Sequence, residues 1–308
     1  MSSPLALPEN YDVQAHMPAH QVHGRVFHAT IPAVQLASEL MANGTPADIA
    51  EAADIFRAVL TCQEVREADP HLGNFRWELE DEVVEDLNAV QFVLFYCIPV
   101  LCKTPDALSP DLLAAMRRAM ALGLQEIARI DVAPTYTNIV IKDIVNSCLG
   151  GQLLNDETTA RRGREKLVRW MAHVDTYGLP AEYNSPNYAS VAVRVLGRLV
   201  ELTEDEHTRI RARTMLARLG LSAALHIHPG TGNWAGPFSR AYSHAVFNAD
   251  AFNVDNVRAW LDDGQLPAWI GDLLQRPDVP EQIDETAHGE EPVALSTYHS
   301  PSFSLGVA

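Results

Sequence analysis

The sequence has little basic charge and no long apolar run. Of its 308 residues, 23 are Lys or Arg and 40 are Asp or Glu, which gives a formal net charge of −17. Nucleic acids and anionic membranes are bound by clustered cations, so we expect neither as a partner. The longest apolar candidate, Phe92 to Cys102, contains Pro99 and is shorter than the roughly 18 apolar residues of a membrane-spanning helix. These absences predict a folded, acidic protein without a membrane span.

Cysteine is scarce as well. Cys62, Cys97, Cys102 and Cys148 show no CxxC spacing, and three of them stand in apolar helical runs, where a reduced thiol packs as a small hydrophobic group. The first ten residues have neither a basic start nor a long apolar stretch, so they do not resemble a secretion signal. We therefore expect a cytoplasmic protein.

Cofactor and metal motifs are also missing. The glycine-rich segment 230–236 follows no predicted strand and is not interpreted as a dinucleotide-binding loop. His226 and His228, with His244 beyond them, do not form a recognisable zinc ligand set. The sequence predicts no cofactor and no metal.

Helical periodicity dominates the sequence after residue 30. Thr45 and Pro46 suit the N-cap and first position of a helix, and Thr203 begins a segment with capping-box spacing. No run is typical of a strand bounded by hairpin turns. We expect an irregular arm over residues 1–30 and helices over 45–66, 81–102, 110–130, 137–154, 156–174, 185–201 and 203–226.

Polar and aromatic clusters recur where the more apolar helices begin. Asp86 and Tyr136 are 50 residues apart, and Tyr136 and Tyr183 are 47 apart, which favours one helical hairpin per repeat. Stacked hairpins close into a ring whose inner helices direct their N-termini into one cavity, where carboxylates and oxyanions are stabilised. The sequence thus predicts an all-α protein with a single α/α toroid domain over residues 31–308.

The order of these short motifs resembles the six-hairpin-glycosidase-like proteins, and the resemblance covers roughly residues 75 to 308. It implies an (α/α)6 toroid, a shape that hosts glycoside hydrolases, polysaccharide lyases, dehydratase-isomerases and cyclases. Chains of this family continue beyond the segment corresponding to 302–308, so the ring is expected to be open, truncated, or completed by another chain in a homo-oligomer. The motifs are Trp77 with Asp86-Leu87-Asn88, Tyr136-Thr137-Asn138-Ile139, Glu182 to Pro186, His228-Pro229, Ala235 to Tyr242, and Thr297-Tyr298.

Glu182 is the first candidate for acid–base chemistry. It stands at the mouth of an apolar helix beside Tyr183 and Asn184, where partial desolvation would raise the pKa of its carboxyl group. The alternative is a carboxylate that caps a helix. Asp86 is its candidate partner, or else part of a solvated acidic helix start. Two carboxylates would cleave a glycosidic bond at separations of about 5 Å for retention or roughly 6.5–9.5 Å for inversion.

The other candidates suit elimination or substrate binding. A lyase would use Tyr188 or His228 as base, with Asn184 and Arg240 neutralising a substrate carboxylate. Aromatic rings would stack on sugars or enclose an apolar molecule. The remaining substrate-binding candidates are Asn88, Tyr136, Asn138, Tyr183, Trp234, Tyr242 and Tyr298.

Three functions remain open at this point. The first is a carbohydrate-active enzyme, hydrolase or lyase, for an oligosaccharide or small molecule. The second is a biosynthetic dehydratase, isomerase or cyclase for a terpenoid or polyketide-like molecule, and the third is a non-catalytic binding scaffold. An open groove with paired carboxylates would favour sugars, whereas a closed aromatic chamber with one acid would favour a hydrophobic substrate.

Overall fold

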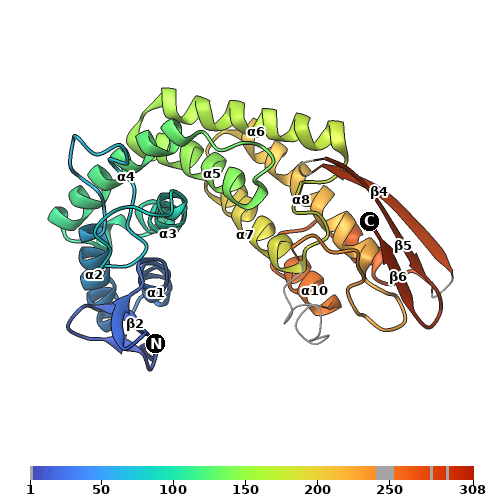
Figure 1. Cartoon of the computed structure of the whole chain (residues 1–308), viewed down its shortest axis with the longest axis horizontal. Coiled ribbons are helices and arrows are strands. Elements are labelled where there is room, and N and C mark those ends of the chain that lie inside the picture. Colours follow the sequence, from blue (N-terminus) through green and yellow to red (C-terminus); the bar gives the residue numbers. More distant parts are fainter. Residues whose placement is uncertain (1–2, 241–252, 278–279, 289–290) are drawn as a thin grey trace. The chain divides into compact units, whose positions relative to one another are not determined.

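Helices make up most of the computed structural model, which describes residues 3–240, 253–277, 280–288 and 291–308. These residues contain ten α-helices and two three-stranded antiparallel sheets (Figure 1). The chain is therefore predominantly helical, and the all-α prediction is wrong at both ends. In the described part, no helix is both long and apolar enough to cross a membrane.

The chain forms two compact units. Unit 1 comprises residues up to 131 together with 146–163, and unit 2 comprises 132–145 together with 164–308. Helices α5 (Thr137–Leu154) and α6 (Glu157–Tyr177) therefore contribute residues to both.

Unit 1 begins with a sheet where the sequence predicts an irregular arm. Strands β1 to β3 pair in sequence order, and the described helices that follow pack α1 on α2 and α3 on α4. Buried Phe56, Phe75 and Phe95 belong to its core. The elements are β1 (Tyr11–Asp12), β2 (Met17–Val22), β3 (Arg25–His28), α1 (Thr30–Asn43), α2 (Pro46–Thr61), α3 (Ala89–Lys103), the 3-10 turn η1 (Pro105–Ala107) and α4 (Pro110–Ile130).

Local capping decides where these helices begin. The Thr45 side chain accepts from Asp48 N at the start of α2, which confirms that N-cap. Helix α3 begins at Ala89, eight residues later than predicted. The reason is a turn in which the Asp86 carboxylate accepts from Asn88 N and Nδ2, while buried Asn74 Oδ1 accepts from Val90 N and fixes the first helical turn.

Unit 2 is built around the hairpin of α7 and α8, on which α10 and α11 pack. The N-cap of α8 is Asp205, whose side chain accepts from Thr208 N, and not Thr203 as the capping-box spacing predicts. Asp143 and Lys166 form a buried ion pair of 2.7 Å between α5 and α6. The elements are α7 (Pro186–Leu202), α8 (Glu206–His226), α10 (Val254–Asp262), α11 (Trp269–Leu273), β4 (Glu281–His288), β5 (Pro292–His299) and β6 (Ser304–Val307).

Strands β4 to β6 form the second sheet and lie beside α8 (Figure 1). Glu285 is paired with Leu295, and both belong to the face on which Leu179 and Ala287 form an apolar cluster. Tyr298, predicted at the start of a last inner helix, is instead an exposed residue of β5. Helical periodicity misled the prediction because the buried face of β4 carries a carboxylate at Glu285, which breaks the apolar alternation of a half-buried strand.

Candidate functional site

The N-terminus of α5 holds Glu182 in a fixed position. Glu182 Oε2 accepts a 2.8 Å hydrogen bond from Asn138 N, and Oε1 accepts one of 2.8 Å from Asn138 Nδ2. Glu182 N donates to Thr137 Oγ1 at 3.4 Å. The first N–H groups of a helix have no partner within it and carry partial positive charge. The carboxyl group, 8% exposed as a residue, thus caps a helix other than the one it precedes.

Burial shifts the titration of two groups around Asn138. It raises the pKa of Glu182, against the opposing effects of the Asn138 hydrogen bonds, Arg240 and Lys142. Burial also lowers the pKa of Lys142 to about 7, with Arg194 acting in the same direction and Glu182 against it. Lys142 Nζ donates to Asn138 O at 2.9 Å. An acid and a base whose pKa values move toward neutrality are suited to proton transfer.

The loop after α8 is anchored on Asn184. The side chain of Asn184 accepts from Trp234 Nε1 at 2.7 Å and donates to Ala235 O and Pro237 O, each at 2.9 Å. Its φ of 41° lies in the left-handed region, which asparagine tolerates better than most residues. Because Asn184 stands close to Glu182 in the sequence, these bonds hold the loop near Glu182.

Arg240 is the last residue described in this segment. Its Nη2 atom is 3.6 Å from Glu182 Oε1, and its guanidinium carbon is 5.6 Å from the ring centre of Tyr188. An arginine so placed is attracted by both the carboxylate and the aromatic face. Glu182, Tyr188 and Arg240 therefore form one connected group.

A small cavity opens at Glu182. Its volume is about 30 Å³, which is room for roughly two water molecules. Glu182 is the one carboxylate among its described lining residues. The lining is otherwise aromatic, apolar or weakly polar: Thr137, Leu179, Pro180, Tyr183, Asn184, Tyr188, Ala189, Ala192, Leu219, Ser222, Ala223 and Trp234.

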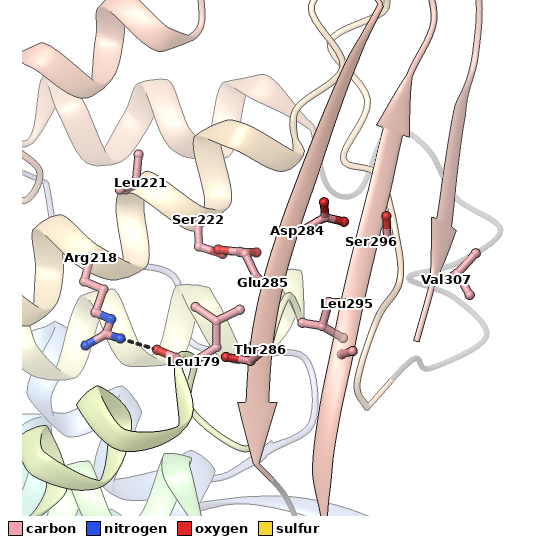
Figure 2. Close-up of a pocket in the computed structure, with 12 residues that line it drawn as sticks. Leu179, Arg218, Leu221, Ser222, Asp284, Glu285, Thr286, Leu295, Ser296 and Val307 are labelled. Carbon is pink, nitrogen blue, oxygen red and sulfur yellow. Dashed lines mark hydrogen bonds between the residues drawn. The ribbon is translucent and has the colours of Figure 1, made fainter.

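A larger cavity of about 640 Å³ lies between α8 and the second sheet (Figure 2). In Figure 2, Ser222 of α8 and Glu285 of β4 face each other, and Leu295 of β5 lies below them. Leu179 and Ser222 line both cavities. The two cavities are therefore neighbours that share a wall.

Seven of the predicted site residues, Glu182 included, are in the connected group or in the segments that support it. Asn138 and Arg240 contact Glu182, and Trp234 contacts Asn184. Tyr183 lines the small cavity, and its carbonyl oxygen accepts from Ser239 Oγ at 2.6 Å. Tyr188 also lines the small cavity and lies against Arg240. The sequence clusters beginning at 136 and 182, and the segment after α8 as far as Arg240, therefore meet in one place.

Other predicted residues are placed differently. Asp86 and Asn88 belong to unit 1, where they make the turn before α3. Tyr136 and Tyr298 are 38% and 37% exposed and do not line the small cavity among its described residues. Tyr242 lies outside the described residues.

His228 is held by a hydrogen bond at each of its ring nitrogens. Its Nδ1 atom accepts from Thr231 N at 3.0 Å, so Nε2 carries the proton and donates to Ser300 O at 2.8 Å. The ring is 1% exposed. Both nitrogens are thus used to connect the loop after α8 with the segment after β5.

Sequence reasoning missed Lys142, Ser222 and Glu285. A lysine inside the apolar run of α5, one turn after Asn138, is the one local signal for the first. No local sequence signal distinguishes Ser222 or Glu285, because they come together only when β4 packs beside α8. Among the described residues no group of three or more His, Cys, Asp or Glu side chains could hold a metal ion.

The fold and the site define a predominantly helical protein with a carboxyl group buried at a helix N-terminus beside an apolar cavity. The chain belongs to the family described as Domain of unknown function (DUF8769), which matches residues 6–265. That range contains Glu182 and the loop to Arg240, whereas β4 to β6 lie beyond it. Comparisons with curated proteins and with solved structures give no match.

Proposed function

We propose that the protein is an acid–base enzyme for a small, largely apolar molecule, of the dehydratase, isomerase or cyclase class, with Glu182 as its proton donor. The observation that carries the proposal is a single buried carboxyl group among the described residues of an aromatic-lined cavity. Two carboxylates across an open groove would have favoured sugar cleavage. A terpenoid or polyketide-like substrate suits this lining better.

Burial favours the protonated form of Glu182, which can give its proton to an oxygen or a double bond of the substrate. The carboxylate that results keeps two hydrogen bonds from Asn138 and gains from the positive charge of Arg240. These groups are in place before the proton moves, so they stabilise the charge without rearrangement. The carboxylate regains a proton when the rearranged product loses one.

The small cavity holds only the reacting end of a substrate. The larger cavity, which borders it at Leu179 and Ser222, offers volume for the remainder. Leu179 and Ser222 stand between the two spaces. Apolar surroundings also exclude water, which strengthens the electrostatic contacts of the acid.

The test is turnover by a Glu182→Gln variant. Gln keeps the shape and can bond Asn138 after a flip of that amide, but it cannot donate a proton as an acid. Wild-type protein is screened by mass spectrometry against unsaturated and hydroxylated apolar molecules. We expect Glu182→Gln to lower kcat by about 10²-fold or more with little change in KM. The exposed Glu67→Gln serves as the matched control, and full turnover by Glu182→Gln would exclude Glu182 as the acid.

A carbohydrate-active enzyme is the second candidate. The rings of Tyr183, Tyr188 and Trp234 at the small cavity favour it, since such rings stack on sugars. The same screen therefore includes oligosaccharides with neutral and with acidic sugars. Cleavage of these, without turnover of any apolar molecule, would replace the first candidate by the second.

We also propose that the helical hairpins are repeats of an α/α toroid. Support comes from the packing of α1 on α2, α3 on α4 and α7 on α8 within their units. A crystal structure tests ring closure, and light scattering tests completion by a second chain. The free state of all four cysteines is in keeping with a cytoplasmic location, which fractionation would check.

A further inference from the structure

Glu285 is a carboxyl group in the wall of the larger cavity with one oxygen unused. Its Oε2 atom accepts from Ser222 Oγ at 3.2 Å. Among the described residues, no group donates a hydrogen bond to Oε1. The side chain is 18% exposed, and burial raises its pKa. A carboxylate partly removed from water is stabilised further by a cation or by additional donors.

The nearby cation on α8, Arg218, supplies only part of this compensation: its charge lowers the pKa of Glu285 against the effect of burial, but its hydrogen bonds go to other groups. Arg218 pairs with Asp175 and donates to Val174 O and Gly178 O. Its guanidinium group is therefore held by other acceptors, as the bond drawn in Figure 2 illustrates.

His226 adds no positive charge beside Glu285. Its Nδ1 atom lies 2.8 Å from Ser222 O, which can only accept, so Nδ1 carries a proton. Burial, together with Arg276, lowers the pKa of this imidazole and favours its neutral form. Neutral His226 then presents a lone pair on Nε2, which is 3.6 Å from Glu285 Oε2. The pair lacks a positive charge.

Hydrocarbon makes up much of the rest of the wall, which also includes the charged residues Arg218 and Asp284 and the neutral polar residues Ser222, Thr286 and Ser296. Leu179 and Leu295 are buried and pack with Ala287, while Leu221 and Val307 contribute further apolar surface. A volume of about 640 Å³ falls within the usual range of small-molecule sites. The net charge of −17 attracts cations to the protein.

We infer that this cavity binds an organic cation with an apolar body, an alkyl or cycloalkyl amine, whose ammonium group pairs with Glu285 while its hydrocarbon part contacts Leu179, Leu221 and Leu295. The ammonium group donates the charge-assisted hydrogen bonds that Oε1 lacks. This inference concerns binding by the cavity and holds whether or not Glu182 transfers a proton.

Calorimetric titration with three probes of equal length, hexylamine, hexanol and hexanoate, tests the inference on the full chain at pH 7. We expect hexylamine to bind at least tenfold more tightly than the other two. Glu285→Gln should remove that preference and leave hexanol binding unchanged. Glu291→Gln, an exposed change in the same hairpin, is the matched control and should behave like wild type.

A second variant covers the case in which Glu285→Gln disturbs the hairpin. Leu221→Trp fills the cavity from α8, keeps Glu285, and should weaken hexylamine and hexanol alike. Equal binding of hexylamine and hexanoate would overturn the inference, as would hexylamine binding that neither Glu285→Gln nor Leu221→Trp changes. Glu182→Gln should leave hexylamine binding intact. The turnover assay on that variant and the binding assay on Glu285→Gln can therefore fail independently of each other.

Discussion

Replacement of Arg276 by Met should destabilise the carboxyl end of α8. Arg276 donates to Ala224 O and Leu225 O, at 2.9 and 2.8 Å, and to Ile227 O at 2.8 Å. Its Nε atom also pairs with Glu281, and its side chain is 12% exposed. The last carbonyl groups of a helix have no partner within it, and a basic side chain is well suited to satisfy them.

The size of the destabilisation follows from the hydrogen bonds that Met cannot make. Met preserves most of the apolar stem, so the loss is of hydrogen bonds and not of packing. At the end of α8, three backbone carbonyls would lose a charged donor, at about 1 kcal/mol each, and Glu281 would lose its partner for about 0.5 kcal/mol more. The free energy of opening at the end of α8 should therefore fall by about 3–4 kcal/mol.

Native-state hydrogen exchange is the suitable assay, because it reports the end of α8 separately from the rest of the chain. Arg258→Met is the matched control, since Arg258 is 60% exposed and, within the described ranges, has Asp255 at 3.0 Å as its ion-pair partner. That change should cost at most about 0.5 kcal/mol. If Arg276→Met lowered the opening free energy by less than about 1 kcal/mol, the reasoning from buried carbonyl groups would be refuted.

Two further predictions concern unit 2. The pKa of Glu182 is raised in the folded state, so protonation favours folding, and stability should fall as pH rises from the unfolded value through the raised one. Urea denaturation between pH 4 and pH 8 should show this slope in wild type and a smaller one in Glu182→Gln; identical slopes would contradict it. Gly178→Ala should destabilise by about 2–4 kcal/mol, because Gly178 has φ of 99° and an added Cβ would overlap Thr286 O. Thermal denaturation checks this, with Gly24→Ala, at φ 78° and in open space, as the control for φ alone.

The helices could be predicted because their signals are local. The starts of α2 and α5 follow from Thr45 and from the polar cluster at 136–138, since caps and the 3.6-residue period act within a few residues. The start of α3 could not be predicted, because its first turn is fixed by a residue outside it: Oδ1 of buried Asn74 accepts a hydrogen bond from Val90 N. The strands β4 and β5 were missed because a half-exposed sheet with acidic residues on both faces lacks clear alternation.

The candidate site divides in the same way. The sequence by itself determined that Glu182, Asn184 and the loop to Arg240 are of the types that acid–base chemistry needs. Only the tertiary structure decided that Asn138 holds Glu182, that Lys142 titrates near neutrality, and that Glu285 faces a cavity. The physical reason is that residue type and short-range periodicity are written along the chain, whereas burial, and with it the pKa and the pairing of charges, depends on segments that meet only on folding.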